Sequence, residues 1–272
     1  MAPFPTSPSS FVRTLSGQRE LVAELVRGDI VGRYRGSMLG IVWSLASPLL
    51  LLGAFTFVFG TVFPTRWGGA VAGHGEFALV LFPGILLHAL LAEPVNRAPG
   101  LVTAVPNYVK KVVFPLELLP LVAVATAVFH TLIGFGVLVV ALLVVRGTLP
   151  ATSIAVPLIL APYVLLILGV TWFLAALGVY LRDIAQVTGL VTMLLMFLSP
   201  VFYPASALSA EYRGWLALNP LTLPLEQTRD ALIWGRRPDW SALAVYAAIA
   251  LAVACAGYWW FQKSRKGFAD VL

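Results

Sequence analysis

The sequence predicts an all-α integral membrane protein with six transmembrane helices. Of its 272 residues, 60% are hydrophobic and only 11% are charged, and the mean hydropathy is +0.91. A chain this apolar cannot hide its side chains in a water-soluble core, so it needs lipid. A bilayer core of about 30 Å asks for roughly 20 apolar residues per helix. Several runs of that kind lie between short polar connections.

Residues 1–272 form one predicted membrane domain. The first element is an amphipathic helix at about 18–35, because apolar residues recur there at helical spacing between charged ones. It is too polar to span the membrane and is expected to lie in the cytoplasmic membrane interface. The alternative is an ordinary solvated helix. Between spans five and six, prolines and charges break the chain into two short re-entrant or external helices. The spans are expected at about 38–63, 77–97, 115–145, 154–180, 187–203 and 240–262.

The basic residues predict the orientation. Twelve of the 18 Lys and Arg residues fall in the N-terminal region, the second-to-third connection, the loop at Arg182 and the C-terminus, all on one side of a six-span topology. The positive-inside rule then places both termini in the cytoplasm. The net charge of +6 is therefore interpreted as a topology signal, with no nucleic-acid partner expected. Residues 1–10 lack the apolar core and basic start of a cleaved signal peptide.

Recognisable catalytic chemistry is missing from the sequence. It contains no phosphate-binding loop, zinc-hydrolase motif or nucleophile elbow, so an enzyme with its own nucleotide site is not expected. The single cysteine, Cys255, excludes a disulfide framework and a cysteine-based metal site. We expect no metal and no cofactor in this chain.

A few polar residues interrupt the apolar runs. Glu93 and Arg97 are spaced for an i,i+4 ion pair, and Glu117 would favour the start of its own helix. His88 and His130 are expected to form hydrogen bonds between helices. Neither histidine has an evident acidic residue at similar depth, which argues against a proton relay. Glycines at 32, 36 and 40 permit either close helix approach or a flexible elbow.

The junction of the interface helix and the first span is the predicted place where substrate enters. Arg33 and Arg35 lie level with lipid headgroups, and arginine pairs bidentately with phosphate oxygens. Tyr34 and Trp43 could receive a sugar or a polyprenyl unit against a ring face. The alternative is that these arginines only anchor the helix. Further aromatic residues are candidates for a channel surface that stacks against sugars, or for lipid packing: Phe55, Phe59, Phe197, Phe202 and Tyr203.

Five motifs in order carry a family resemblance. They are VRGDIVGRYRGSMLGIVW at 26–43 followed by Pro48, KKVVFP at 110–115, YLRDI at 180–184, SPVFYP at 199–204, and Asn219-Pro220 followed by Glu226 and Arg229. Together they cover nearly the whole chain. The sequence thereby resembles the ABC-transporter permeases that export cell-surface polysaccharides, of the O-antigen (Wzm-like) and teichoic-acid exporter types.

The resemblance implies a homodimer bound to two copies of a separate ATPase, which would carry ATP and Mg. The substrate would be a polyprenyl-linked glycan moved out across the bacterial cytoplasmic (inner) membrane. Helices that dock on the ATPase would match residues 98–113 and the loop at 182–183, with Asn107, Lys110, Lys111, Arg182 and Asp183 as coupling residues. An external gate would match residues 205–235, with Asn219, Pro220, Glu226 and Arg229.

Two other functions stay open from the residues alone. One is an ABC exporter of a lipid or a small hydrophobic molecule, which has the same architecture. The other is a membrane enzyme acting on polyprenyl lipids. Such an enzyme needs convergent carboxylates or histidines, and the sequence has no evident cluster of them.

Overall fold

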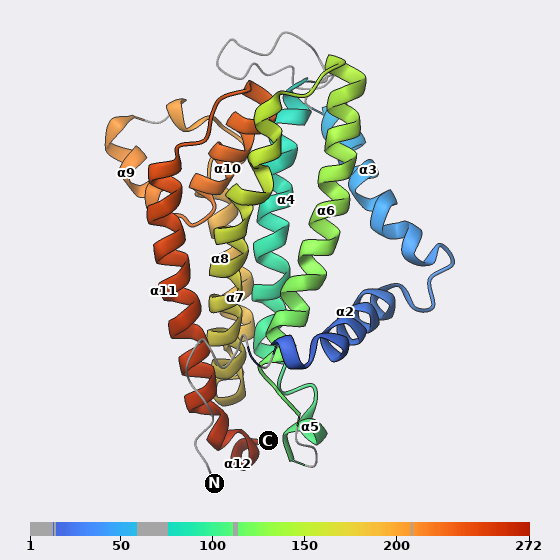
Figure 1. Cartoon of the computed structure of the whole chain (residues 1–272), viewed down its shortest axis with the longest axis vertical. Helices are drawn as coiled ribbons and strands as arrows, with labels where there is room; N and C mark the ends of the chain where they lie inside the picture. Colours follow the sequence, from blue (N-terminus) through green and yellow to red (C-terminus); the bar gives the residue numbers. More distant parts are fainter. Residues whose placement is uncertain (1–12, 14, 59–75, 111–113, 208) are drawn as a thin grey trace.

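The computed structural model describes residues 13, 15–58, 76–110, 114–207 and 209–272. All regular structure within these ranges is helical, which confirms the predicted all-α class. Long helices run side by side along the molecule (Figure 1). The short helices α5 and α12 lie at the same end as α2, and α9 and α10 lie towards the other end (Figure 1).

The bounds of α4, α6, α7 and α11 lie close to the predicted spans, whereas α3 begins later and α8 ends earlier than predicted. Short 3-10 or π turns extend several of them, including η1 (Gly40–Val42) before α3 and η3 (Ala98–Gly100) after α4. The α-helices are α2 (Arg19–Tyr34), α3 (Trp43–Phe57), α4 (Glu76–Arg97), α5 (Pro106–Lys110), α6 (Leu118–Arg146), α7 (Val156–Tyr180), α8 (Ile184–Phe197), α9 (Ala210–Leu218), α10 (Thr222–Arg229), α11 (Trp240–Ser264) and α12 (Phe268–Val271).

Five helical segments of the described chain are long and apolar enough to cross a membrane. They contain α3, α4, α6, α7 and α11. The fifth predicted span corresponds to α8, which has 14 residues and is about 21 Å long at 1.5 Å per residue. Because that is shorter than a bilayer core, a sixth crossing stays a prediction. The first predicted span begins at Gly40 instead of residue 38, and its last residues, 59–63, lie outside the described residues.

Helix α4 forms the centre of the bundle, and α3 lies at its edge. In the apolar window of α4, 72% of the residues are buried, against 6% in that of α3. Helix α4 packs against α3, α6, α7, α8 and α10, whereas α3 contacts α4 and α6 and diverges from the bundle towards its connection with α2 (Figure 1). The polar residues near the end of α4 therefore lie on a largely buried helix.

Helices α7 and α11 approach very closely because small residues face each other. A Cβ atom added at Gly257 would lie 2.1 Å from the carbonyl oxygen of Gly169, and one added at Gly169 would lie 2.6 Å from the Cα atom of Ala254. Small residues at an interface allow the van der Waals packing that drives helix association in lipid.

The join between α2 and α3 is an elbow. Gly36 and Gly40 have φ angles of 86° and 51°, which residues with a side chain rarely adopt. In the described structure nothing lies within 4 Å of a Cβ atom built at Gly32, Gly36 or Gly40. The structure thus decides for the elbow and against close helix approach at these glycines.

Candidate functional site

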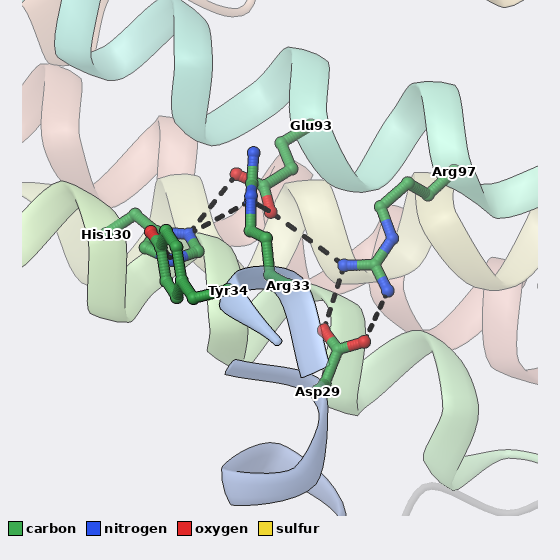
Figure 2. A network of polar contacts seen from close by, with 6 residues as sticks. All are labelled: Asp29, Arg33, Tyr34, Glu93, Arg97 and His130. Carbon is green, nitrogen blue, oxygen red and sulfur yellow. Dashed lines mark hydrogen bonds and ion pairs between the residues drawn. The ribbon is translucent and has the colours of Figure 1, made fainter. Parts of the chain in front are cut away.

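A network of six charged and polar side chains joins three helices (Figure 2). We call it the charge network. Its members are Asp29, Arg33 and Tyr34 from α2, Glu93 and Arg97 from α4, and His130 from α6.

The ion pairs of the charge network run crosswise between two helices. Arg97 donates two hydrogen bonds to Asp29, from Nη1 to Oδ2 at 2.9 Å and from Nη2 to Oδ1 at 2.6 Å. Arg33 Nη1 donates to Glu93 Oε1. Each helix carries an acid followed four residues later by an arginine, and each acid binds the arginine of the other helix. The predicted i,i+4 pair of Glu93 and Arg97 is also present, with 3.8 Å between Oε1 and Nη1.

His130 connects α6 to this pair of helices. Its Nδ1 atom lies 3.2 Å from Nη1 of Arg33, and its Nε2 atom lies 3.0 Å from the hydroxyl of Tyr34. A guanidinium can only donate, so Nδ1 of a neutral ring accepts from Arg33 and Nε2 carries the hydrogen and donates to Tyr34. Glu93 Oε2 is 3.5 Å from Nδ1. The expectation that His130 has no acidic neighbour is therefore wrong.

A pocket of about 750 Å³ opens beside the charge network between α2 and α4, and we call it the α2–α4 pocket. It is large enough for a phosphate-bearing headgroup. Its lining combines ionic groups with small residues that leave space: Gly28, Asp29, Gly32, Arg33, Ala89, Ala92, Glu93, Asn96 and Arg97. The four ionic side chains are two carboxylates and two guanidinium groups, so their charges cancel.

Asp29 is ionised in this arrangement. It lies on α2, outside the candidate membrane spans. Partial burial alone would raise its pKa, but the hydrogen bonds and charge of Arg97 hold the pKa of Asp29 below its usual value. The Asp29–Arg97 pair is thus a charged, bidentate link between α2 and α4.

The predicted residues for substrate entering from the interface fall into two groups. Arg33 and Tyr34 belong to the charge network, and the side chain of Arg33 is still 48% exposed. Arg35 caps the end of α2 and is exposed, and Trp43 begins α3 and is also exposed. Neither of these two belongs to the charge network.

The predicted channel aromatics gather mainly after α8. The rings of Phe197 and Phe202 lie 6.3 Å apart between centroids, and the hydroxyl of Tyr203 donates to the carbonyl of Phe197 at 3.4 Å. Phe197 is 61% exposed. Phe55 is partly buried against the core on α3, and Phe59 lies outside the described residues.

Helix α5, which contains the predicted coupling residues Asn107 and Lys110, lies at the end of the molecule that holds α2 and α12 (Figure 1). Asn107 is exposed on α5, and Arg182 and Asp183 are exposed in the turn from α7 to α8. Lys110 ends α5, and Lys111 lies outside the described residues.

The predicted gate residues fix α10 against the bundle. Asn219 Nδ2 donates to the carbonyl of Leu195 at 3.0 Å, and the hydroxyl of Tyr246 donates to the carbonyl of Pro220 at 2.8 Å. Arg229 is 4% exposed. Glu226 is half-buried.

Arg229 binds backbone carbonyls from two other segments. Its Nε atom donates to the carbonyl of Val80 at 2.8 Å. Its Nη1 atom donates to the carbonyl of Pro200 at 2.5 Å, and its Nη2 atom donates to the carbonyl of Val201 at 2.7 Å. We call this arrangement the Arg229 clamp. It joins α10 to α4 and to the turn after α8.

The remaining polar predictions concern helix contacts. His88 Nε2 forms a 2.9 Å hydrogen bond with the carbonyl of Thr192 on α8, so the expected interhelical role of both histidines is confirmed. Glu117 lies at the start of α6, as expected, but its side chain makes no capping bond. It instead accepts from Arg265 Nη1 at 2.7 Å.

The sequence interpretation missed Asp29 as a site residue and assigned Glu93 only a local pair. A usable signal was present, because Asp29 and Arg33 share the four-residue spacing of Glu93 and Arg97. Two such pairs on separate helices can exchange partners where the helices meet, and here residue 29 binds residue 97 while residue 33 binds residue 93.

The fold and the helix arrangement define a class of membrane protein, and the family is established by comparison. Residues 20–233 match the family model described as ABC-2 type transporter, and the chain belongs to this family. It is a multi-pass membrane subunit of a transporter and not itself an enzyme.

Similar proteins match along nearly their whole length. The O-antigen export system permease protein RfbA of Myxococcus xanthus is 27% identical over 268 residues, covering 96% of this chain and 98% of the relative. A protein of the same name from Klebsiella pneumoniae is 27% identical, covering 93% and 95%. The polysialic acid transport protein KpsM of Escherichia coli is 24% identical, covering 89% and 93%.

Proposed function

We propose that this chain is the membrane subunit of an ABC exporter that moves a lipid-linked cell-surface polysaccharide out of the cytoplasm. The observation that carries the proposal is the near full-length match to permeases of O-antigen export and to a polysialic acid transport protein. The ABC-2 family and the five apolar helical segments agree with a transporter subunit. Since the sequence contains no phosphate-binding loop, a separate ABC ATPase supplies the energy.

The chain resides in the bacterial inner membrane with both termini in the cytoplasm. Support comes from the basic residues on α2, on α5, at Arg182 and after α11, because α2, α5 and α12 lie at one end (Figure 1). The positive-inside rule makes that end cytoplasmic. Helices α9 and α10 then lie towards the outer side.

The working unit is a homodimer with two copies of the ATPase. Helices α3 and α8 support this arrangement, because both present exposed apolar side chains, among them Leu50 at 66% and Phe197 at 61%. A second copy or lipid must cover such faces. The channel runs between the two copies, with Phe197, Phe202 and Tyr203 as a stacking surface for sugars. Asn107, Lys110, Lys111, Arg182 and Asp183 contact the ATPase.

The lipid-linked substrate enters at the α2–α4 pocket. Its phosphate groups bind Arg33, while Arg35 and Trp43 contribute from the elbow beside it. Support comes from the partly exposed guanidinium of Arg33 at a pocket of headgroup size, on a helix suited to the membrane interface. Arginine binds phosphate oxygens through charge-assisted hydrogen bonds.

Reconstituting export in cells tests the proposal. A strain that lacks its own O-antigen permease receives this chain together with an ABC ATPase and glycan-synthesis genes from the organism that carries it. Polymer is expected at the cell surface with the wild-type chain, and inside the cell with the Asp183→Arg variant, which is inserted normally but uncoupled. Polymer export that is equal with and without this chain would contradict the proposal.

A further inference from the structure

We propose that Glu93 is a specificity-determining residue: it occupies Arg33 when the α2–α4 pocket is empty and yields only to a ligand that carries more negative charge than one carboxylate. The inference rests on the proposed function, because it takes the substrate to be a lipid diphosphate. It adds that the pocket rejects phosphodiester headgroups, which surround the protein in the membrane.

The charge balance of the pocket is the first observation. Two carboxylates and two arginines line it, so no net positive charge attracts anions there. A phosphate group that approaches Arg33 meets the carboxylate of Glu93, which already accepts a hydrogen bond from Nη1 of Arg33. Like charges at such short range repel each other. A ligand that binds Nη1 of Arg33 therefore replaces Glu93 at this atom.

The second observation is the difference between the two arginines. Arg97 is fixed, because both of its terminal nitrogens bind Asp29. Arg33 contacts Glu93 through Nη1 alone, and nearly half of its side chain is exposed. Arg33 can therefore turn towards a ligand while the Asp29–Arg97 pair keeps α2 attached to α4.

The third observation explains why Glu93 can release Arg33. Its Oε1 atom lies 3.8 Å from Nη1 of Arg97, and its Oε2 atom lies 3.5 Å from Nδ1 of His130. Without Arg33 the carboxylate still faces one fixed cation, Arg97, and Nδ1 of His130, which carries the hydrogen and can donate it in the other tautomer of the ring. An unpaired buried charge would be costly, but this one keeps partners, so the exchange is feasible.

Competition of this kind produces selectivity. A phosphodiester headgroup such as that of phosphatidylglycerol carries one negative charge, like the carboxylate that it would have to displace. A diphosphate carries at least two charges and more acceptor oxygens, so it gains more from Arg33 than Glu93 does. Competition from Glu93 therefore weakens the binding of a phosphodiester more than the binding of a diphosphate. Specificity then comes from an element that disfavours the competing ligand.

A binding experiment on the purified full-length permease in lipid nanodiscs tests the inference. The probes are farnesyl diphosphate, inorganic pyrophosphate and, as nanodisc lipid, phosphatidylglycerol. In Glu93→Gln we expect farnesyl diphosphate to bind roughly fivefold tighter than in the wild type, as expected when one partly exposed ion pair no longer competes. We also expect phosphatidylglycerol to become an effective competitor. If pyrophosphate binds more weakly than farnesyl diphosphate, the site is assigned to a lipid headgroup. Equal binding of the two probes would overturn the assignment of the pocket to a lipid ligand.

Two matched variants control for unrelated effects. Glu76→Gln removes an ion pair with Arg146 from the other end of the same helix and should leave both affinities unchanged. Arg33→Gln should abolish the gain when it is combined with Glu93→Gln. If Glu93→Gln does not fold, Glu93→Asp serves instead, because its shorter side chain reaches Arg33 less well and should give a smaller gain.

The outcomes separate the inference from the proposed function. Unchanged or weaker diphosphate binding in folded Glu93 variants overturns the role of Glu93, even if the chain exports polymer. Absence of export from cells together with tighter diphosphate binding in Glu93→Gln overturns the proposed function and keeps the role of Glu93. A gain that survives in the double variant with Arg33→Gln also overturns the inference.

Discussion

The charge network and the Arg229 clamp use arginine in opposite ways. Arg229 is almost fully buried, and its three hydrogen bonds reach backbone carbonyls of α4 and of the turn after α8. Arg33 and Arg97 are partly exposed, and their ionic partners are the side chains of Asp29 and Glu93. Both regions join helices that are distant in the sequence, and the charge network also opens onto the α2–α4 pocket.

The two regions differ in whether the arginine can exchange its hydrogen-bond partners. A backbone carbonyl is held by the main chain and cannot rotate away as a side chain can, so a buried arginine on three carbonyls favours one geometry. Carboxylate side chains can rotate and can find other cations, so the charge network has alternative pairings. The first arrangement suits a structural joint, and the second suits a site that binds anions.

The largest effect is expected from breaking the Arg229 clamp. Arg229→Met leaves the carbonyls of Val80, Pro200 and Val201 without these donors, and each lost bond to a buried group costs about 1–3 kcal/mol. We expect a large loss of folded protein, measured as the midpoint of heat-induced aggregation of the detergent-solubilised chain.

Arg236→Met is the matched control for the clamp. Its side chain is 72% exposed and forms one ion pair with Asp230 at 3.4 Å, so its removal should change stability by less than about 1 kcal/mol. Equal stability of the Arg229→Met and Arg236→Met variants would mean that the clamp is not a structural joint.

A smaller effect is expected from the Asp29–Arg97 pair. Asp29→Asn and Arg97→Gln should each loosen α2, by about 1 kcal/mol, since the pair is bidentate but only partly buried. Hydrogen exchange in the peptide covering residues 19–34 measures this loss directly. A double-mutant cycle completes the test: additive effects of the two substitutions would show that the pair does not attach α2 to α4.

The long helices could be predicted from the sequence because their signal is local. The bounds of α4, α6, α7 and α11 follow from the lengths of apolar runs and from the charges at their ends. Helix α8 is shorter than expected because it ends at Phe197, shortly before Ser199-Pro200, although the apolar run continues. Hydropathy does not register the helix-ending effect of a proline.

The contacts of the site could be predicted only in part. The i,i+4 spacing revealed Glu93 with Arg97, but the crosswise pairs join residues 60 and 68 positions apart. His130 and Glu93 come from different helices, so their proximity depends on packing. The burial of Arg229 had no sequence signal, since a charge in a proline-broken segment is more typical of an exposed loop.

The smallest effect is expected from acidification, and it separates the fixed pair from the exchangeable one. Because its pKa in the folded protein is lower than usual, Asp29 stabilises the docking of α2 at any pH above its ordinary value of 3.8. This contribution is lost only as the pH falls through the lowered folded value. Between pH 5 and 8, hydrogen exchange of residues 19–34, corrected for its intrinsic pH dependence, should therefore show no change due to Asp29. Below pH 4, the wild type should lose protection and approach the Asp29→Asn variant, whose own protection should stay constant. A loss of protection between pH 5 and 8 would contradict this assignment, because it would place the pH dependence of α2 docking outside the Asp29–Arg97 pair.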